Sequence, residues 1–265
     1  MLTRFVKSPG QVQQLLQAYA APSFDDIRSL SLTFETAPEV VRELIPPPLE
    51  PAAEPRVSVS VYKVRRSNCV GPFNGASVNI ACTYRGEPGL YCLTMPMDTG
   101  IAVIFGRELY AEPKKLADIR LEETGGQARG IVTRHGVSFL EIAGTFDAPL
   151  EPVDAAGTTR HYYFKYLPAA DGSGLAFDPE LVCVTHTGRT HNVTRGTGTV
   201  TFRESVHDPL IDIPVLSVGP ATLSEGETKT RAEVVATVPA ADFLPYAFAK
   251  TDDLTRWAYA PQPVG

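Results

Sequence analysis

The feature that most constrains the fold is a succession of short segments in which apolar and polar residues alternate. Val57, Val59 and Val61 are separated by serines, and another alternating run begins at Val78. A period of two places the apolar side chains on one face of a β-strand. Many such segments, separated by Gly and Pro turns, are typical of a sandwich, a barrel or a large sheet.

The same reasoning extends the strand prediction through most of the chain. Strands are expected over residues 28–34, 57–61, 78–84, 90–95, 119–122, 128–134, 137–146, 160–166, 181–193, 198–204 and 230–238. The sequence contains no internal repeat and no linker-like segment. We therefore predict a single α+β domain over residues 1–265, mostly antiparallel β, with a β-barrel or large curved sheet and a few short helices.

Apolar residues at helical spacing predict two helices in the first fifth of the chain. The first covers residues 11–20, within outer limits of about 10–21. The second follows Thr36, which is expected to cap it together with Glu39 three residues later. Pro46 and the prolines after it then stop this helix.

Two more helices are predicted later in the chain. Residues 98–110 are expected to form a helix whose apolar face carries Ile101, Ile104, Phe105 and Leu109. A closing helix over residues 239–249 is expected to place Ala241, Leu244 and Phe248 on one face. Between them, Pro113 ends helical geometry, so Lys114 is expected to open a strand.

Composition narrows the range of partners and locations. The net charge of −6 argues against a nucleic-acid partner, because phosphate binding needs a basic surface. No apolar run is long enough to span a membrane, and the first residues do not resemble a secretory signal. The four cysteines have no CxxC spacing and the histidines are scattered, so we expect a cytoplasmic protein without a metal site.

Residues 106–117 contain the pattern with the clearest chemical meaning. Lys114 and Lys115 stand together after Pro113, with apolar residues on both sides. A lysine that is removed from water, or placed beside a second cation, loses its proton more readily. The neutral amine can form a Schiff base with a ketone. The same residues would also fit a turn with two solvated lysines.

The segment 106–117 closely resembles the active-site segment of the acetoacetate decarboxylase family. Supporting similarity is found around Arg28 and over residues 45–51, 71–76, 195–200 and 208–215. The resemblance runs from about residue 23 to 250 and implies the same α+β fold. It also implies an imine-forming lyase that acts on a small oxo acid without a cofactor, in a homo-oligomer.

The resemblance assigns roles to the two lysines. It implies that Lys114 forms the imine and that Lys115 is its activating neighbour. Adjacent residues in a strand point to opposite faces, so Lys115 could instead point away and pair with a carboxylate.

The resemblance also suggests residues that bind the substrate. Arg28 matches an arginine that faces the substrate carboxylate, which a guanidinium can hold through two hydrogen bonds. An ion pair with Asp25 or Asp26 is the alternative for Arg28. Phe73 and Gly75 lie in the matching loop and are expected at the substrate.

The sequence departs from the family pattern at two acidic positions. Counted without gaps, two active-site glutamates of the family fall on Ser60 and Gly75 here. Glu112 stands where the family usually has an aromatic residue, and it could supply the missing acid or face solvent. An ionised Glu112 beside Lys114 would favour the charged ammonium, which opposes imine formation.

Loss of the glutamates favours aldolase or dehydratase chemistry over decarboxylation, although both use an imine as electron sink. Decarboxylation of acetoacetate or another 3-oxo acid is the alternative, and non-catalytic binding of a carbonyl metabolite is the second alternative. An aldolase or dehydratase needs a new proton carrier, for which Tyr84, Tyr110 and Tyr246 are the candidates. Tyr246 is favoured as a catalytic residue and Tyr84 is expected to contact substrate.

Overall fold

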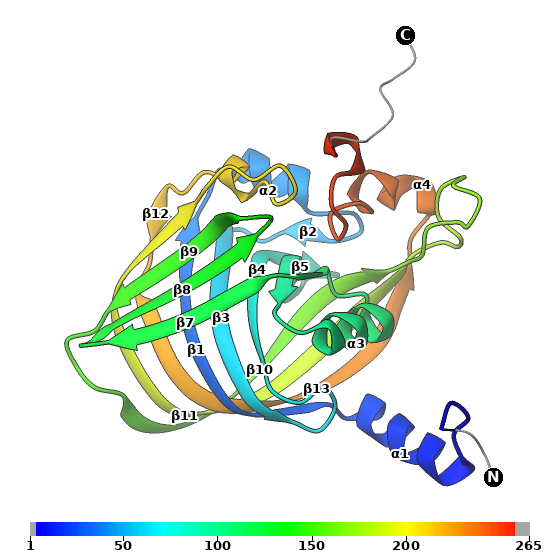
Figure 1. Cartoon of the computed structure of the whole chain (residues 1–265). Coiled ribbons are helices and arrows are strands. Elements are labelled where there is room, and N and C mark those ends of the chain that lie inside the picture. Colours follow the sequence, from blue (N-terminus) through cyan, green and yellow to red (C-terminus); the bar gives the residue numbers. More distant parts are fainter. Residues whose placement is uncertain (1–3, 258–265) are drawn as a thin grey trace.

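The computed structural model describes residues 4–257, which form a large curved 13-stranded sheet with short helices around it (Figure 1). The strands are β1 (Ser23–Glu35), β2 (Glu50–Pro51), β3 (Arg56–Ser67), β4 (Phe73–Tyr84), β5 (Glu87–Met97), β6 (Lys114–Leu116), β7 (Asp118–Thr124), β8 (Gln127–Arg134), β9 (Val137–Thr145), β10 (Glu151–Lys165), β11 (Glu180–Phe202), β12 (Ser217–Val218) and β13 (Ala221–Thr237). The α-helices are α1 (Pro9–Ala20), α2 (Pro38–Leu44), α3 (Gly100–Tyr110) and α4 (Ala240–Phe243). The predicted α+β class with a large curved sheet is confirmed.

Strand order explains how the lysine segment enters the sheet. The main path is β10-β5-β4-β3-β1-β13-β11-β9-β8-β7, and β6 is added beside β5. Most neighbours are antiparallel, but β5 pairs in parallel with both β6 and β10. A parallel pair needs a crossover connection, and α3 provides it between β5 and β6. Lys114 thereby pairs with Met95.

Two apolar clusters lie on opposite faces of the central strands. The larger one joins Leu30, Val61 and Ile80 to the apolar residues of β7, β8 and β9. The smaller one lies near α3 and includes Phe73, Met95, Met97, Phe105 and Tyr163. Val61 belongs to the larger cluster, whereas the next residue, Tyr62, packs against the smaller one. Alternation along a strand therefore decides which cluster a side chain joins.

The structure corrects the expected start of the second helix. This helix, α2, begins at Pro38 with Ala37 as its N-cap and no side-chain capping bond. Thr36 is buried, and its hydroxyl has no hydrogen-bond partner among the described residues. Proline at the first position needs no N–H partner and has a helical φ, so α2 can begin without the expected cap.

The buried face of α3 also differs from the expected one. Ile101 and Ile104 are exposed, whereas Phe105 is buried as predicted. The helix turns Ala102 and Gly106 inward instead, together with Tyr110. Because these inward residues are small, the helix can approach the lysine segment closely. Helical periodicity in the sequence does not reveal this need for close packing.

The closing segment is not one continuous helix. It consists of α4 and a 3₁₀ turn over Leu244–Tyr246. Pro245 lacks an N–H and interrupts regular α-helical bonding. The expected face is wrong, because Leu244 and Phe248 are exposed while Phe243 and Ala247 are buried.

Strand β11 merges two predicted strands into one and links two parts of the sheet. It pairs with β13 up to Gly196 and with β9 from Thr197 onward. A Cβ atom at Gly196 would lie 1.9 Å from the backbone oxygen of Thr145. Glycine is therefore required where the strand changes partners, because no flexible side chain can move to relieve that contact.

This close approach predicts that Gly196→Ala lowers the free energy of unfolding by about 2 kcal/mol or more, measured by urea denaturation. Gly157→Ala is the matched control, because a Cβ atom there meets nothing within 4 Å. Equal stability of the two variants would contradict the proposed role of Gly196.

Candidate active site

The centre of the candidate site is a buried pair formed by Lys114 and Glu112. The distance from Lys114 Nζ to Glu112 Oε2 is 2.6 Å, and each side chain is 8% exposed. Glu112 therefore faces inward, which answers the choice that the sequence left open between a pocket residue and a solvent-facing one. A buried amine and a buried carboxylate in direct contact can exchange a proton without water.

Local geometry at the end of α3 creates this pair. Ala111 adopts a left-handed conformation with φ of 62°, which ends the helix and reverses the chain. The N–H of Glu112 then donates to the carbonyl of Gly106 at 3.2 Å. A Cβ atom at Gly106 would lie 1.9 Å from Glu112 Oε2 and 2.4 Å from Lys114 Nζ. Only glycine leaves space for both side chains beneath the helix.

Tyrosine and cysteine side chains surround the pair. Burial raises the pKa of Tyr62, Tyr110, Tyr163 and Cys92, and the negative charge of Glu112 adds to each rise. The hydroxyl of Tyr163 is buried and has no hydrogen-bond partner among residues 4–257. The tyrosine hydroxyls and the Cys92 thiol around the pair therefore keep their protons and can donate hydrogen bonds. In this low-dielectric space they would strongly polarise a reacting carbonyl.

Two histidines from neighbouring strands extend this polar region. The rings of His161 and His186 lie 4.8 Å apart, although their positions in the chain do not predict that they meet. Burial lowers the pKa of His161 to about 3, and the His186 ring contributes to the shift. Burial also lowers the pKa of His186, with Glu112 opposing the effect and Lys114 adding to it. Both rings are therefore neutral at pH 7.

Lys115 points away from Lys114 and joins a separate ionic cluster. Its Nζ lies 3.1 Å from Asp208 Oδ1 and donates to the His207 carbonyl at 2.7 Å. Arg134 contacts Asp208 at 2.6 Å and Asp252 at 2.7 Å. Burial lowers the pKa of Lys115, although Asp208 opposes the shift. The alternative in which Lys115 pairs with a carboxylate is therefore confirmed.

Arg28 is held by carboxylates other than the expected ones. Its guanidinium donates to Glu123 and to Glu225, the latter at 2.9 Å, rather than to Asp25 or Asp26. In the register of β1 with β3, Arg28 lies opposite Lys63, and Leu30 lies opposite Val61. Residues two apart on a strand point to the same face, so the Arg28 side chain lies on the face of the sheet that carries Leu30 and Val61. The structure does not bring Arg28 to Lys114.

The remaining expected residues divide between the two faces. Phe73 packs edge-on against Tyr62, and a Cβ atom at Gly75 would lie 2.6 Å from the Tyr62 ring. Both residues therefore lie on the same face of the sheet as Lys114. Tyr84 belongs to the larger cluster and donates to the Val235 carbonyl at 3.2 Å. Its predicted contact with substrate is therefore not supported by its position.

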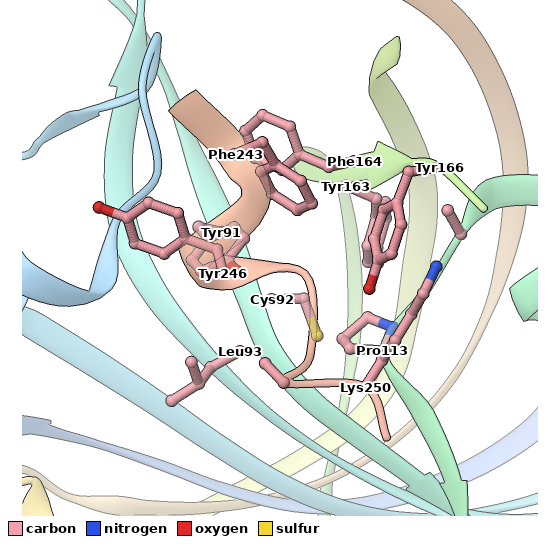
Figure 2. A pocket seen from close by; sticks show the side chains of 12 residues that line it. Tyr91, Cys92, Leu93, Pro113, Tyr163, Phe164, Tyr166, Phe243, Tyr246 and Lys250 are labelled. Atoms are coloured by element: carbon pink, nitrogen blue, oxygen red, sulfur yellow. The ribbon is translucent and has the colours of Figure 1, made fainter. Parts of the chain in front are cut away.

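A small cavity of about 20 Å³ lies next to the site and contains Tyr246 in its lining (Figure 2). Lys250 lines the same cavity, with its Nζ 3.7 Å from the centre of the Tyr166 ring. Cys92 and Tyr163 belong both to this lining and to the surroundings of Glu112. Lys114 and Glu112 are not part of the lining, and Tyr246 packs against the larger cluster, so its position does not support the predicted catalytic role.

Sequence reasoning missed Tyr62, Cys92, Tyr163 and Lys250 as possible site residues. The first three lie in strands whose facing depends on a register that one sequence does not provide. Lys250 becomes buried only when residues distant in the chain pack around it. Arg107 donates through Nη1 to the backbone carbonyls of Lys114 and Lys250, at 3.3 and 3.1 Å.

Within residues 4–257, no three histidine, cysteine or acidic side chains come together as metal ligands. No helix in this part of the chain has the length and hydrophobicity needed to cross a bilayer.

Comparison with known proteins places these features in a family context. The family model described as acetoacetate decarboxylase matches residues 8–238. Acetoacetate decarboxylase of Streptomyces nogalater is 31% identical over 203 residues, covering 74% of this chain and 80% of the relative. A Burkholderia cenocepacia acetoacetate decarboxylase is 29% identical over 155 residues, covering 57% of this chain and 62% of the relative.

Solved structures show the same fold. Acetoacetate decarboxylase from Legionella pneumophila has a TM-score of 0.75 at 19% identity, with 82% of this chain and 88% of that chain covered. The enduracididine biosynthesis enzyme MppR, complexed with the condensation product of pyruvate and imidazole 4-carboxaldehyde, has a TM-score of 0.68 at 16% identity. Its alignment covers 81% of this chain and 88% of MppR.

The space beneath α3 predicts the effect of a single methyl group. Gly106→Ala should destabilise the protein by about 2 kcal/mol or more in urea, despite the better helix propensity of alanine. Gly100→Ala lies in the same helix, where a Cβ atom meets nothing within 4 Å, and should not destabilise. A stabilised Gly106→Ala protein would contradict the packing described for the pair.

The buried imidazole of His161 predicts a pH-dependent stability. Its folded-state pKa lies below the ordinary value of 6.5, so the unfolded chain binds more protons between about pH 6.5 and 3. The stability contributed by the neutral ring is complete above pH 6.5 and falls as the pH drops through this window.

His161→Phe removes this titration while keeping an aromatic ring beside Tyr163. We expect the loss of unfolding free energy between pH 7.5 and 5.0 to be smaller in the variant by about 2 kcal/mol. Urea denaturation at the two pH values measures this difference. Parallel losses in both proteins would show that His161 does not titrate on unfolding.

Proposed function

Because the chain belongs to the acetoacetate decarboxylase family, we propose that it is a lyase that forms an imine between Lys114 and a small oxo acid. The observation that carries this proposal is the buried contact between Lys114 Nζ and Glu112 Oε2. An imine needs a neutral amine, and an ionised Glu112 in contact favours the ammonium instead. The reactive state is therefore the one in which the proton has moved from Lys114 to Glu112, which their hydrogen-bond distance allows.

The first chemical step follows from this arrangement. The Lys114 amine attacks the substrate carbonyl, the carbinolamine loses water, and an iminium forms. Protonated Glu112 can donate the proton that the departing hydroxyl needs. The buried hydroxyls of Tyr110 and Tyr163 can stabilise the oxygen that becomes negative during attack.

Aldolase or dehydratase chemistry is the favoured second step. Glu112, once ionised, can remove a proton from the carbon next to the iminium, and the electrons move to nitrogen to give an enamine. The enamine carbon then attacks an aldehyde, or a hydroxyl on the next carbon leaves as water. Ser60 and Gly75 supply no acid here, so Glu112 replaces the proton carrier that the resemblance placed at those positions.

Decarboxylation of a 3-oxo acid is the second candidate. The observation that favours it is the 31% identity with a protein named acetoacetate decarboxylase. The same iminium accepts the electrons that remain when the carbon–carbon bond to CO2 breaks, which gives an enamine. The enamine carbon then takes a proton from water, relayed through Glu112, and water hydrolyses the resulting iminium to release the ketone and the Lys114 amine. The two candidates share Lys114 and differ in the bond that breaks.

We also propose a reducing cytoplasmic location, which suits the four cysteines that the structure shows as free thiols. A homo-oligomer remains part of the proposal. Val12, Leu15 and Leu16 of α1 are exposed, and a second copy of the chain could cover them.

Borohydride trapping tests the proposed function. The protein is incubated separately with acetoacetate, pyruvate and acetopyruvate, reduced, and analysed by intact mass and peptide mapping. We expect one adduct on Lys114, none in Lys114→Ala, and an unchanged adduct in the exposed-lysine control Lys229→Ala. Glu112→Gln should lower turnover about 100-fold or more, the range expected for loss of a general base.

The products separate the candidates. Release of CO2 from acetoacetate, lost in Lys114→Ala, would establish decarboxylation, whereas condensation or loss of water without CO2 would support the favoured chemistry. Saturable binding without an adduct or product would instead establish a non-catalytic binding protein. Full turnover by Lys114→Ala would exclude imine catalysis.

A further inference from the structure

We propose that the substrate reaches Lys114 along a groove of about 370 Å³ on the same face of the sheet, and that His186 contacts it between the groove and the lysine. This inference rests on the proposed function, because it assigns the part of the oxo acid that extends beyond the reacting carbonyl. The groove crosses β10, β11 and β13, which pair side by side in the sheet (Figure 1).

Three glycines hollow out this surface, which we call the glycine groove. Gly157 of β10 lies opposite Gly188 of β11, and Gly226 belongs to the adjoining strand β13. A Cβ atom at Gly157 would meet nothing within 4 Å, so the space in front of it is empty. Larger residues at these positions would fill the hollow, and their absence leaves room for a substituent of several atoms.

Strand alternation places the groove on the face that carries the smaller apolar cluster. His186 follows Val184 by two residues on β11, so both side chains point to the same side. Val184 belongs to that cluster together with Met95, which lies opposite Lys114 in the pairing of β5 with β6. Ile27 lines the groove and also packs against the cluster. The groove and the Lys114 amine therefore share one face of the sheet.

His186 lies at the inner end of the groove, next to the lysine–glutamate pair. Burial lowers the pKa of its ring, Glu112 opposes the shift and Lys114 adds to it, so both charges of the pair act on the ring. The Nδ1 atom lies 3.3 Å from the Thr230 hydroxyl. Among residues 4–257, Thr230 is the one hydrogen-bond partner of the ring, which leaves Nε2 for the substrate.

Two buried polar groups continue the path from His186 toward the pair. The His161 ring lies 4.8 Å from the His186 ring, and it is stacked on Tyr163 at 6.4 Å. The Nδ1 of His161 and the hydroxyl of Tyr163 are buried, and neither has a hydrogen-bond partner in the described part of the chain. Unpaired groups of this kind are costly, and a substrate that passes His186 would pair with them. Tyr163 in turn lies within the field of Glu112.

The lining of the groove indicates an uncharged substituent that forms hydrogen bonds. Arg189 is already paired with Asp154 and Glu225 with Arg28, so neither attracts a further charge. Glu227 adds a negative charge that disfavours a second carboxylate on the substrate. The substrate class that follows is an oxo acid with an uncharged, hydroxylated substituent. The hydroxyl groups available to it are those of Thr159, Thr190, Ser224 and Thr228.

The test compares a short and a long oxo acid in wild type and in Gly157→Leu, whose side chain enters the groove without a clash at its Cβ atom. Adduct formation on Lys114 is measured against the concentration of pyruvate and of 6-hydroxy-2-oxohexanoate. In wild type we expect half-maximal trapping of the longer acid at about 10-fold lower concentration than for pyruvate. Gly157→Leu should abolish this preference and change the trapping of pyruvate less than about 3-fold.

Two further variants sharpen the test. Gly100→Leu adds the same side chain in α3, where a Cβ atom also meets nothing within 4 Å, and should keep the preference of wild type. His186→Phe keeps a ring beside His161 and removes both ring nitrogens. It should weaken trapping of the longer acid about 10-fold and that of pyruvate less than about 3-fold. If thermal unfolding shows that Gly157→Leu does not fold, His186→Phe decides the question.

Three outcomes would overturn the proposal. Wild type without a preference for the longer acid would show that the groove binds no part of the ligand. An unchanged preference in Gly157→Leu would show that the substituent lies elsewhere. Equal losses for both acids in His186→Phe would show that His186 acts only through the structure around Lys114.

A direct binding measurement separates this proposal from the proposed function. Calorimetry with 6-hydroxy-2-oxohexanoate is performed on Lys114→Ala and on Lys114→Ala combined with Gly157→Leu, so that no imine contributes. Weaker binding by the double variant supports the groove even if wild type forms no adduct. Equal binding by both, or binding by neither, overturns the groove even if wild type forms the imine.

Discussion

The buried contact between Lys114 and Glu112 is the constraint on which the site depends. Burying either charge alone would be costly, whereas an ammonium and a carboxylate in contact compensate each other and can share a proton. Their enclosure requires a helix without a side chain at Gly106 and a chain reversal at Ala111. The parallel pairing of β6 with β5 then fixes Lys114 in the sheet, so fold and chemistry depend on the same few residues.

Strand alternation explains why two adjacent lysines have different environments. Lys114 faces the tyrosines near α3, whereas Lys115 enters an ionic cluster with Asp208 and lines a groove of about 690 Å³. That cluster joins β6 to β8 through Arg134, which also contacts Asp252. Lys115 therefore supports the site by anchoring its strand, and Glu112 is the charged group in direct contact with Lys114.

The sequence predicted the features that are local and left open those that depend on register. Alternation located the strands, and the lysine segment identified Lys114 and raised Glu112 as a possible acid. The burial of Phe105 was predicted, but the inward turn of Gly106 was not, because it depends on side chains that arrive from the following strand. Lys250 carries no local signal, since its burial arises only when β10 and the C-terminal segment pack together.

The positions of Gly75 and Tyr62 leave no space for an acidic side chain at residue 75. The Tyr62 ring occupies the space that a side chain at position 75 would need, with the two Cα positions paired across β3 and β4. A glutamate at 75 and a tyrosine at 62 cannot both adopt this packing. An acid on the loop before β6 avoids the conflict, because it approaches Lys114 from beneath α3. Gly75, the aromatic ring of Tyr62 and the acid of Glu112 therefore form one packing arrangement. It leaves the Glu112 carboxylate in direct contact with the Lys114 amine.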